Sequence, residues 1–358
     1  MSDAAAVDAQ PVRLTAYASG GGCATKIPQA ELGGILASLA LPTPAAALLV
    51  GATTGDDAAV WRLSDELALV VTTDFFAPVV DDPDDYGAIA AANTLSDVYA
   101  MGGTPLLALN LVAWPGEDVL PAAVLGRVLA GAAATVAEAG ASIAGGHSVR
   151  DAEPKFGLAV VGSVDPRAVT DNASGRSGDV LVLTKALGTG VVSNATKLGD
   201  APAGVAAAAV ASMRRLNRDA AAAGAACGVR CATDVTGFGL LGHARNLALA
   251  SGLAVEIDAT DLPLLPGVAG LVGQGTVPGG SRRNLAYADT WTEWDPGVGE
   301  LQRTAATDAQ TSGGLLLAVA PARAAELVGR LRAGGDIGAV VGRLVDGAAG
   351  AVRVLAAG

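Results

Sequence analysis

A cysteine and a lysine stand three positions apart in a glycine-rich stretch near the N-terminus, Gly20-Gly21-Gly22-Cys23-Ala24-Thr25-Lys26. The run of glycines predicts a mobile loop. A nearby ammonium favours the thiolate, which is the form of cysteine that reacts with soft partners. The lysine can equally bind a phosphate group as a point charge. The alternative is an exposed, unreactive cysteine in a tail, so this pair alone does not decide the chemistry.

Aspartates gather at the ends of expected strands and on one expected helix, at Asp56, Asp57, Asp74, Asp97 and Asp234. Strand ends open onto ligand crevices in sheet proteins. Asn93 and Asp97 are four residues apart, so they share a helix face and can point at one ligand. Hard magnesium ions take oxygen ligands and usually need one or two carboxylates each, so the set predicts magnesium binding. For any single aspartate, the alternative is a cap, a turn or a solvated surface position.

Two glycine-rich segments, Gly145-Gly146-His147-Ser148 and Leu187-Gly188-Thr189-Gly190, are expected as turns after or between strands. Exposed backbone N–H groups in such turns can approach phosphate oxygens. Neither segment fits the dinucleotide fingerprint, and the chain has no P-loop pattern, so both of those nucleotide sites are disfavoured. His147 by itself is more often a structural hydrogen-bonding residue than a catalyst.

The hydrophobic pattern predicts an α+β protein of two domains. The first half has expected helices at 28–39, 84–101 and 120–139 and strands at 58–63, 67–73, 106–112, 142–144 and 156–164. A loop containing Gly145-Gly146-His147 separates the last two strands. A second α+β pattern follows Asp165-Pro166, with expected strands at 180–184, 229–233 and 315–318. The expected organisation is an N-terminal segment 1–50, a domain 51–166 and a domain 167–358.

Composition narrows the classes of function. The 358 residues carry a formal net charge of −12, which argues against a nucleic-acid partner. An acidic protein can still bind nucleotides when divalent cations lie between the two anions. Three cysteines cannot form a fully paired framework, and Cys227 and Cys231 are expected to be buried packing residues. Without a signal or long apolar segment, the expected location is the cytoplasm, with no membrane partner.

Several motifs together make the chain resemble the selenophosphate synthetases, within the group that shares the aminoimidazole ribonucleotide synthetase fold. The matching stretches run from Leu14 to about Gly342. They are Gly-Gly-Gly-Cys23-Ala-Thr-Lys26-Ile-Pro, Asp56-Asp57-Ala-Ala-Val, Thr-Thr-Asp74-Phe-Phe, Ala-Ala-Asn93-Thr-Leu-Ser-Asp97-Val-Tyr-Ala-Met-Gly-Gly, Ala-Gly-Gly146-His147-Ser148, Thr233-Asp234-Val-Thr-Gly-Phe-Gly-Leu-Leu-Gly-His243 and Gln310-Thr-Ser-Gly-Gly.

The resemblance implies roles for the matching residues. Cys23 is similar to the family's active-site cysteine and Lys26 to its catalytic lysine. The implied magnesium ligands are Asp57, Asp97 and Asp234. The implied ATP-binding set is Lys26, Thr54, Gly55, Asp56, Asp74, Asp97, Gly146, His147 and Ser148. The chain departs from the family at Thr25, where a second cysteine is frequent, and at Ser19, where a histidine is frequent. We expect Cys23 and Lys26 to suffice.

The same resemblance implies two α/β domains per subunit, with the N-terminal domains of two subunits pairing their strands into a barrel across a homodimer. It implies an enzyme that converts ATP, selenide and water into selenophosphate, AMP and phosphate, the selenium donor for selenocysteine and seleno-tRNA synthesis. A selenium-delivery protein is a possible partner. The alternatives are another ATP-using enzyme of this fold, such as a thiamine phosphate kinase, and a non-catalytic nucleotide-binding protein.

Overall fold

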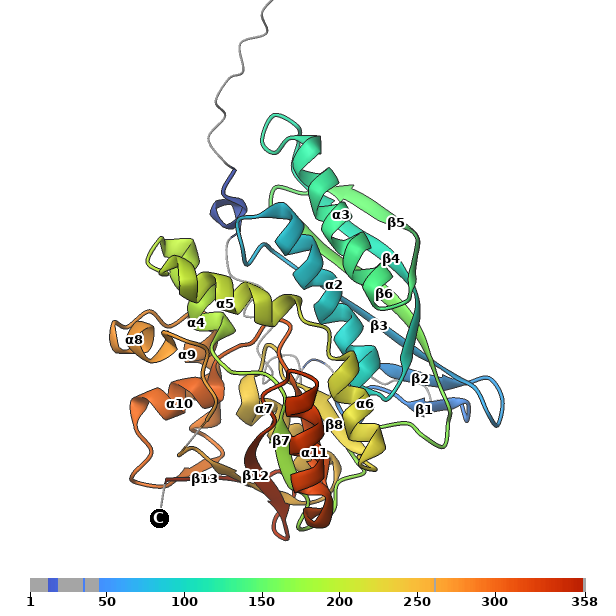
Figure 1. The fold of residues 1–358 in the computed structure, drawn as a ribbon, viewed down its shortest axis with the longest axis vertical. Coiled ribbons are helices and arrows are strands. Elements are labelled where there is room, and N and C mark those ends of the chain that lie inside the picture. The colour runs from blue at the N-terminus through green and yellow to red at the C-terminus, as the bar shows by residue number, and fades with distance from the viewer. Residues whose placement is uncertain (1–11, 19–34, 36–44, 261, 357–358) are drawn as a thin grey trace, which may run out of the picture.

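The computed structural model of the chain describes residues 12–18, 35, 45–260 and 262–356. Within these ranges the chain forms two domains, each built on one β-sheet with helices packed against it (Figure 1). The loop with Cys23 and Lys26 lies outside the described residues, as does nearly all of the helix expected at 28–39. A short 3₁₀ helix, η1 (Leu14–Tyr17), precedes that part of the chain.

The first sheet has the strand order β1-β2-β3-β6-β4-β5. Its strands are β1 (Leu48–Val50), β2 (Ala59–Arg62), β3 (Ala68–Phe76), β4 (Thr104–Trp114), β5 (Ser142–Arg150) and β6 (Lys155–Val164). The expected hairpin is confirmed, because β2 and β3 are antiparallel neighbours with Ala59 opposite Val71. Neighbouring strands are antiparallel except β4 and β5, which run parallel.

The expectation of a loop at Gly145-Gly146-His147 is wrong. These residues continue β5 as an exposed edge strand from Ser142 to Arg150. Gly146 has a φ of 157°, and a Cβ there would lie 2.3 Å from the carbonyl oxygen of Asn110 on β4. Glycine is therefore required by a close backbone approach, beside a register shift in β4, rather than by a turn.

Helices α2 (Pro83–Ala100) and α3 (Ala122–Glu138) cover one face of this sheet (Figure 1). Asp82 caps α2 by accepting from the backbone N–H groups of Asp84 and Asp85 at 2.9 and 3.0 Å. The two helices approach closely, since a Cβ on Gly87 would lie 1.9 Å from the carbonyl oxygen of Val128. Ile89 and Ala100 are buried, and so is the rest of α2 after its first turn.

The second sheet has the order β10-β13-β9-β12-β7-β11-β8. Its strands are β7 (Val180–Leu183), β8 (Cys231–Asp234), β9 (Ala254–Asp258), β10 (Thr292–Trp294), β11 (Leu315–Val319), β12 (Ala339–Val345) and β13 (Val352–Leu355). The strands expected at 180–184, 229–233 and 315–318 are thus confirmed within a few residues. Cys227 and Cys231 are free and buried, as predicted.

The remaining helices belong to the second half of the chain. They are α4 (Thr189–Leu198), α5 (Ala203–Arg214), α6 (Arg218–Ala226), α7 (Gly239–Ala250), α8 (Val268–Gly273), α9 (Gly279–Ala288), α10 (Glu300–Thr307) and α11 (Pro321–Ala333). Helix α2 contacts α5, α6 and β8, so it is shared between the two domains. Among the described residues, no helix is both long and apolar enough to cross a membrane.

Candidate active site

Asp57 and Asp234 meet across the boundary between the domains. Asp57 precedes β2 in the first domain, and Asp234 ends β8, the edge strand of the second sheet. The backbone N–H of Asp234 donates to Oδ2 of Asp57 at 3.2 Å, and the hydroxyl of Thr233 donates to Oδ1 at 2.9 Å. The carboxylate of Asp57 is therefore held against the backbone of Asp234, 177 residues away in sequence, and the two carboxyl groups are close enough to interact electrostatically.

Asp97 of α2 and Asp74 of β3 face the same region. The hydroxyl of Thr72 donates to Oδ2 of Asp97 at 2.5 Å. Burial raises the pKa of the Asp97 carboxyl well above its usual range, and the carboxylates of Asp234, Asp74 and Asp57 raise it further. The pKa of Asp57 is also well above its usual range, first because of burial and then because of Asp234. Four of the five predicted site aspartates are thus linked by electrostatic repulsion, through Asp97 and through the pair Asp57 and Asp234.

This group of carboxylates fits magnesium by its donor chemistry. The donors are hard oxygens, and the side chains of Asp97 and Asp234 are at least nine-tenths buried, where mutual repulsion opposes ionisation. A divalent cation would relieve that repulsion. No set of three His, Cys, Asp or Glu side chains among the described residues is close enough to hold a metal ion by itself. That agrees with magnesium, which typically takes one or two carboxylates and completes its octahedron with water and phosphate oxygens.

Asn93, expected to point at a ligand beside Asp97, is held at both ends by protein groups. Its Nδ2 donates to Oδ2 of Asp74, and its Oδ1 accepts from the backbone N–H of Ser312 at 2.8 Å. Asn93 and Asp97 do share one buried face of α2. In this arrangement the amide orients Asp74 and connects α2 to the second domain.

The Thr54-Gly55-Asp56 turn is fastened to the start of the second domain. Oδ1 of Asp56 accepts from the backbone N–H of Asn172 at 2.7 Å, and its Oδ2 accepts from the Thr54 hydroxyl. The Nδ2 of Asn172 donates in return to the carbonyl oxygen of Gly55 at 2.9 Å. Burial raises the pKa of Asp56. Both carboxylate oxygens of Asp56 therefore serve to position the turn that leads to Asp57.

Gly146, His147 and Ser148 lie apart from the aspartates within one subunit. Gly146 is paired with Asn110, Asn110 with Leu158, and Leu158 with Asp74. This row crosses three strand spacings, which places Gly146 about 14 Å from Asp74. The described residues of the predicted ATP-binding set therefore form two separate groups in the first domain.

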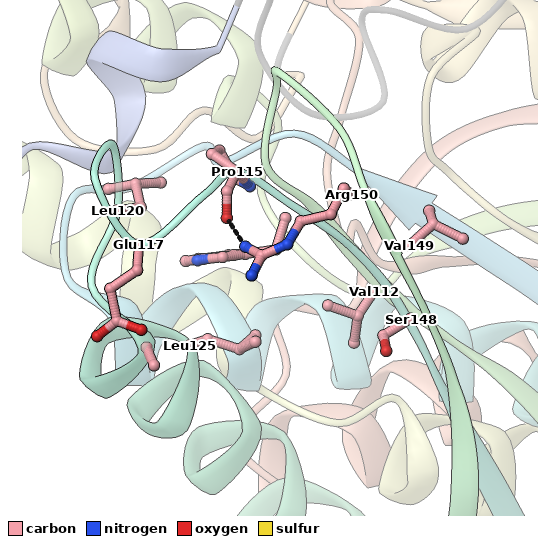
Figure 2. Close-up of a pocket in the computed structure, with 10 residues that line it drawn as sticks. Val112, Pro115, Glu117, Leu120, Leu125, Ser148, Val149 and Arg150 are labelled. Carbon is pink, nitrogen blue, oxygen red and sulfur yellow. Dashed lines mark hydrogen bonds between the residues drawn. The ribbon is translucent and has the colours of Figure 1, made fainter.

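Ser148 lines a pocket of about 380 Å³ at the ends of β4 and β5 (Figure 2). Trp114, Glu117, Leu125 and Arg150 also contribute to its wall. The guanidinium of Arg150 donates to the carbonyl oxygen of Pro115 at 2.6 Å, as Figure 2 shows. None of the five predicted site aspartates lines this pocket, so it is a separate feature of the domain.

The backbone N–H groups of Gly188 and Thr189, expected to approach phosphate, are already used inside the protein. Both donate to Oε1 of Gln310, at 3.0 and 3.1 Å. The next two N–H groups, of Gly190 and Val191, donate to Oδ2 of Asp308 at 3.1 and 3.3 Å. The hypothesis that this turn binds phosphate is wrong, because two side chains about 120 residues away cap the start of α4.

Three polar residues near the aspartates have no role predicted from the sequence. Lys185 is buried, and its Nζ donates to the carbonyl oxygens of Arg215 and Ser312 at 2.7 and 2.9 Å. Thr233 and His243 connect to Asp57 from the second domain. The scarcity of lysine and histidine singles out Lys185 and His243. Thr233 begins the family-like stretch that ends at His243, but no role was predicted for it.

Comparisons with known proteins decide the family. Models of AIR synthase related proteins match residues 55–164 with their N-terminal domain and residues 176–355 with their C-terminal domain. The selenide, water dikinase of Burkholderia ambifaria (strain MC40-6) is 48% identical over 336 residues, covering 94% of this chain and 95% of that protein. The chain belongs to the selenide, water dikinase family. The protein of that name from Myxococcus xanthus (strain DK1622) is 45% identical, covering 94% of this chain and 96% of the relative.

The fold is found more widely than the family. The structure of thiamine-monophosphate kinase from Stenotrophomonas maltophilia K279a is similar with a TM-score of 0.62 at 21% identity, covering 86% of this chain and 91% of that one. At that identity the likeness concerns the fold alone. The predicted two-domain fold, enzyme class and selenide, water dikinase family are therefore confirmed. The roles of individual site residues stay predictions.

Proposed function

We propose that the protein is a magnesium-dependent selenophosphate synthetase that converts ATP, selenide and water into selenophosphate, AMP and phosphate. The observation that carries the proposal is the convergence of carboxylates from both domains, with Asp57 held against Asp234 and both raising the pKa of Asp97. Membership of the selenide, water dikinase family supports the choice of selenide as phosphoryl acceptor.

Asp57, Asp97 and Asp234 are the proposed magnesium ligands. Bound magnesium would neutralise the charge of the triphosphate and align its terminal phosphorus for in-line attack. Thr72 and Thr233 orient the carboxylates of Asp97 and Asp57 by hydrogen bonds, leaving the other lone pairs of those oxygens available. Asp74, oriented by Asn93, lies beside them as a proposed contact of the nucleotide.

In the proposed reaction, a selenium lone pair of selenide forms a bond to the γ-phosphorus of ATP. The bond between that phosphorus and its bridging oxygen breaks, and ADP leaves with the electron pair. Water then cleaves ADP to AMP and phosphate. Lys26 offsets the negative charge that develops on the transferred group, and Cys23 positions selenium. Both residues lie outside the described part of the chain, so their roles rest on the motif and on the family.

The proposed nucleotide contacts are Lys26, Thr54, Gly55, Asp56, Asp74, Asp97, Gly146, His147 and Ser148. Within one subunit the described members of this set fall into two groups, which favours a homodimer whose subunits complete each other's sites. The face of the first sheet opposite α2 supports this, because Val71, Phe75 and Leu109 are 42%, 54% and 39% exposed there. An apolar patch of this kind indicates an interface. Pairing into a shared barrel and a selenium-delivery partner are proposed because of the family. The division into 1–50, 51–166 and 167–358 is proposed from the sequence pattern, and the cytoplasm as location from the cysteine content.

Nucleotide products test the proposal against its nearest rival. The purified protein is incubated with ATP and magnesium, with and without selenide, and the nucleotides are separated by ion-exchange chromatography. AMP that appears only with selenide is the expected result. Conversion of ATP to ADP with thiamine phosphate as acceptor, and no response to selenide, would favour a thiamine phosphate kinase instead. Binding of ATP without turnover would favour a non-catalytic protein.

A further inference from the structure

A chain of hydrogen bonds leads from His243 on α7 to the carboxylate of Asp57. The ring of His243 is 5% exposed and lies against the ring of Phe238, with centroids 5.6 Å apart. Its Nδ1 is 3.3 Å from Oγ1 of Thr233, and that hydroxyl is 2.9 Å from Oδ1 of Asp57. The histidine belongs to the second domain and the aspartate to the first.

The hydrogen-bond network fixes which ring nitrogen carries the proton. The backbone N–H of Thr236 points at Nε2 of His243 at 3.1 Å. A backbone N–H can only donate, so Nε2 must be the acceptor without hydrogen, and the proton is on Nδ1. The Nδ1–H group then donates to Oγ1 of Thr233. The direction of the chain follows from this one backbone contact.

Because Oγ1 of Thr233 accepts a hydrogen bond from His243, the hydrogen of its own hydroxyl must point to a different acceptor. Two acceptors are within reach, Oδ1 of Asp57 at 2.9 Å and the carbonyl oxygen of Asp234 at 3.1 Å. Oδ1 of Asp57 is the nearer of the two acceptors, and it belongs to a side chain whose other oxygen is already fixed by a backbone N–H group. The Thr233 hydroxyl therefore donates to Asp57, while the Asp234 N–H holds the other oxygen of the same carboxylate.

We propose that His243 is a positioning residue that sets the orientation of the Asp57 carboxylate through Thr233. Both ring nitrogens of His243 are hydrogen-bonded to protein groups, so it would act on the site through Thr233. Residues behind a metal ligand commonly change metal affinity by about 10- to 100-fold when they are removed. The inference rests on the proposed function in one respect, which is that Asp57 is a magnesium ligand.

Nuclear magnetic resonance tests the direction of the chain directly. The protein contains only two histidines, so uniform ¹⁵N-histidine labelling of the full chain gives two imidazole spin systems. His243 is expected to show a protonated Nδ1 and an unprotonated Nε2 without metal, whereas His147 lies on an exposed strand. Thr233→Val should shift the Nδ1–H signal of His243. A proton on Nε2 of His243 would overturn the proposal.

Metal affinity tests the consequence, with Mn²⁺ alone as the probe and free Mn²⁺ followed by electron paramagnetic resonance. Thr233→Val removes the hydroxyl with little change of shape, and His243→Phe removes both ring nitrogens but keeps a ring against Phe238. Each should weaken Mn²⁺ binding by about 10- to 100-fold. Thr233→Ser is the matched control, since it keeps the hydroxyl, and should stay within about threefold of wild type.

The outcomes distinguish the positioning role of His243 and Thr233 from the proposed magnesium site. Wild-type affinity in folded Thr233→Val protein would overturn the positioning role while leaving the magnesium site in place. Thr233→Val also covers the case in which His243→Phe does not fold. Absence of Mn²⁺ binding by the wild-type protein would instead overturn the proposed magnesium site, and the positioning role with it.

Discussion

The backbone N–H of Ser312 donates to Oδ1 of Asn93 at 2.8 Å, across 219 residues of sequence. Both residues are fully buried. Ser312 has a φ of 47°, and among the described residues it alone has a positive φ without being glycine. Strained backbone of this kind persists when the surroundings hold it in place. Here the strain directs an N–H group at the amide that orients Asp74.

Asn93→Asp should destabilise the protein, because it replaces an amide donor by a second carboxylate facing Asp74. We expect the free energy of unfolding in urea at pH 7 to fall by roughly 3 kcal/mol, the usual cost of leaving a buried charge uncompensated. At pH 4.5, protonation of the introduced carboxyl group should reduce the difference in unfolding free energy between Asn93→Asp and wild type. Asn194→Asp on the half-buried side of α4 is the matched control. Equal stability of Asn93→Asp and wild type would show that the amide does not orient Asp74.

Lys185 should make stability depend on pH above neutrality. Burial lowers the pKa of its ammonium to about 7, against 10.5 for the unfolded chain. Between these values the unfolded state binds the extra proton, so the stability of the folded state rises with pH. Relative to Lys185→Met, which has no ammonium, wild type should gain roughly 2 kcal/mol of unfolding free energy between pH 7 and pH 9.

Urea titrations of wild type and Lys185→Met, in buffer that contains a chelator, measure the unfolding free energy of each protein at pH 7 and at pH 9. A constant difference between wild type and Lys185→Met over the same pH range would mean that Lys185 is not desolvated in the folded protein. The hydrogen bonds of Lys185 to Arg215 and Ser312 would then contribute to stability without a pH signature.

The segment before the predicted catalytic loop is anchored by Asp81. Its Oδ1 accepts from the backbone N–H and the hydroxyl of Thr15 at 3.0 and 2.6 Å, and its Oδ2 accepts from Arg13 at 3.1 Å. Ala18, at the end of this anchored segment, is five residues before Cys23 in the sequence.

Asp81→Asn should lower selenide-dependent turnover by roughly tenfold, because hydrogen bonds that hold the segment are lost. Tenfold corresponds to an increase of about 1.4 kcal/mol in activation free energy. The affinity for ATP should change little, because no predicted nucleotide contact is altered. Steady-state kinetics and equilibrium ATP binding on the same preparation separate the two effects. Unchanged turnover would show that the anchor has no part in the reaction.

Cys23→Ala should abolish selenide-dependent turnover and leave ATP binding nearly intact, because the thiol is proposed to position selenium and not the nucleotide. Cys227→Ala is the matched control, since Cys227 is buried in the second domain at 4% exposure. It should keep turnover at a modest loss of stability. Full activity of Cys23→Ala would remove the thiol from the mechanism.

Local sequence patterns predict the elements that carry the site better than the contacts between them. The hairpin of β2 and β3 and the buried helix α2 follow from strand alternation, turn residues and helical spacing. The Gly145-Gly146-His147 segment was expected as a loop because glycines usually mark turns, yet here they allow an edge strand to approach Asn110. Close approach of two backbones leaves no local pattern that differs from a turn.

The partners of the site residues could not be predicted from spacing alone. The N–H groups of Gly188 and Thr189 look available until the fold brings Gln310 against them. Asp57 and Asp234 were both identified as strand-end aspartates, but their contact depends on how the two domains pack. Within the second domain, α7 packs against β8 and places His243 behind Thr233, a relationship that the ten-residue separation does not reveal.

The most direct test of the account is phosphorus NMR of the protein with ATP, magnesium and selenide under strict reduction, beside a sample without selenide. Asp234→Asn, and Asp65→Asn in an exposed turn as its control, are measured in parallel. The account predicts selenophosphate together with AMP and phosphate in the wild-type and Asp65→Asn samples, and strongly reduced formation of all three in Asp234→Asn. Formation of ADP as the only nucleotide product, or the same spectrum with and without selenide, would contradict it.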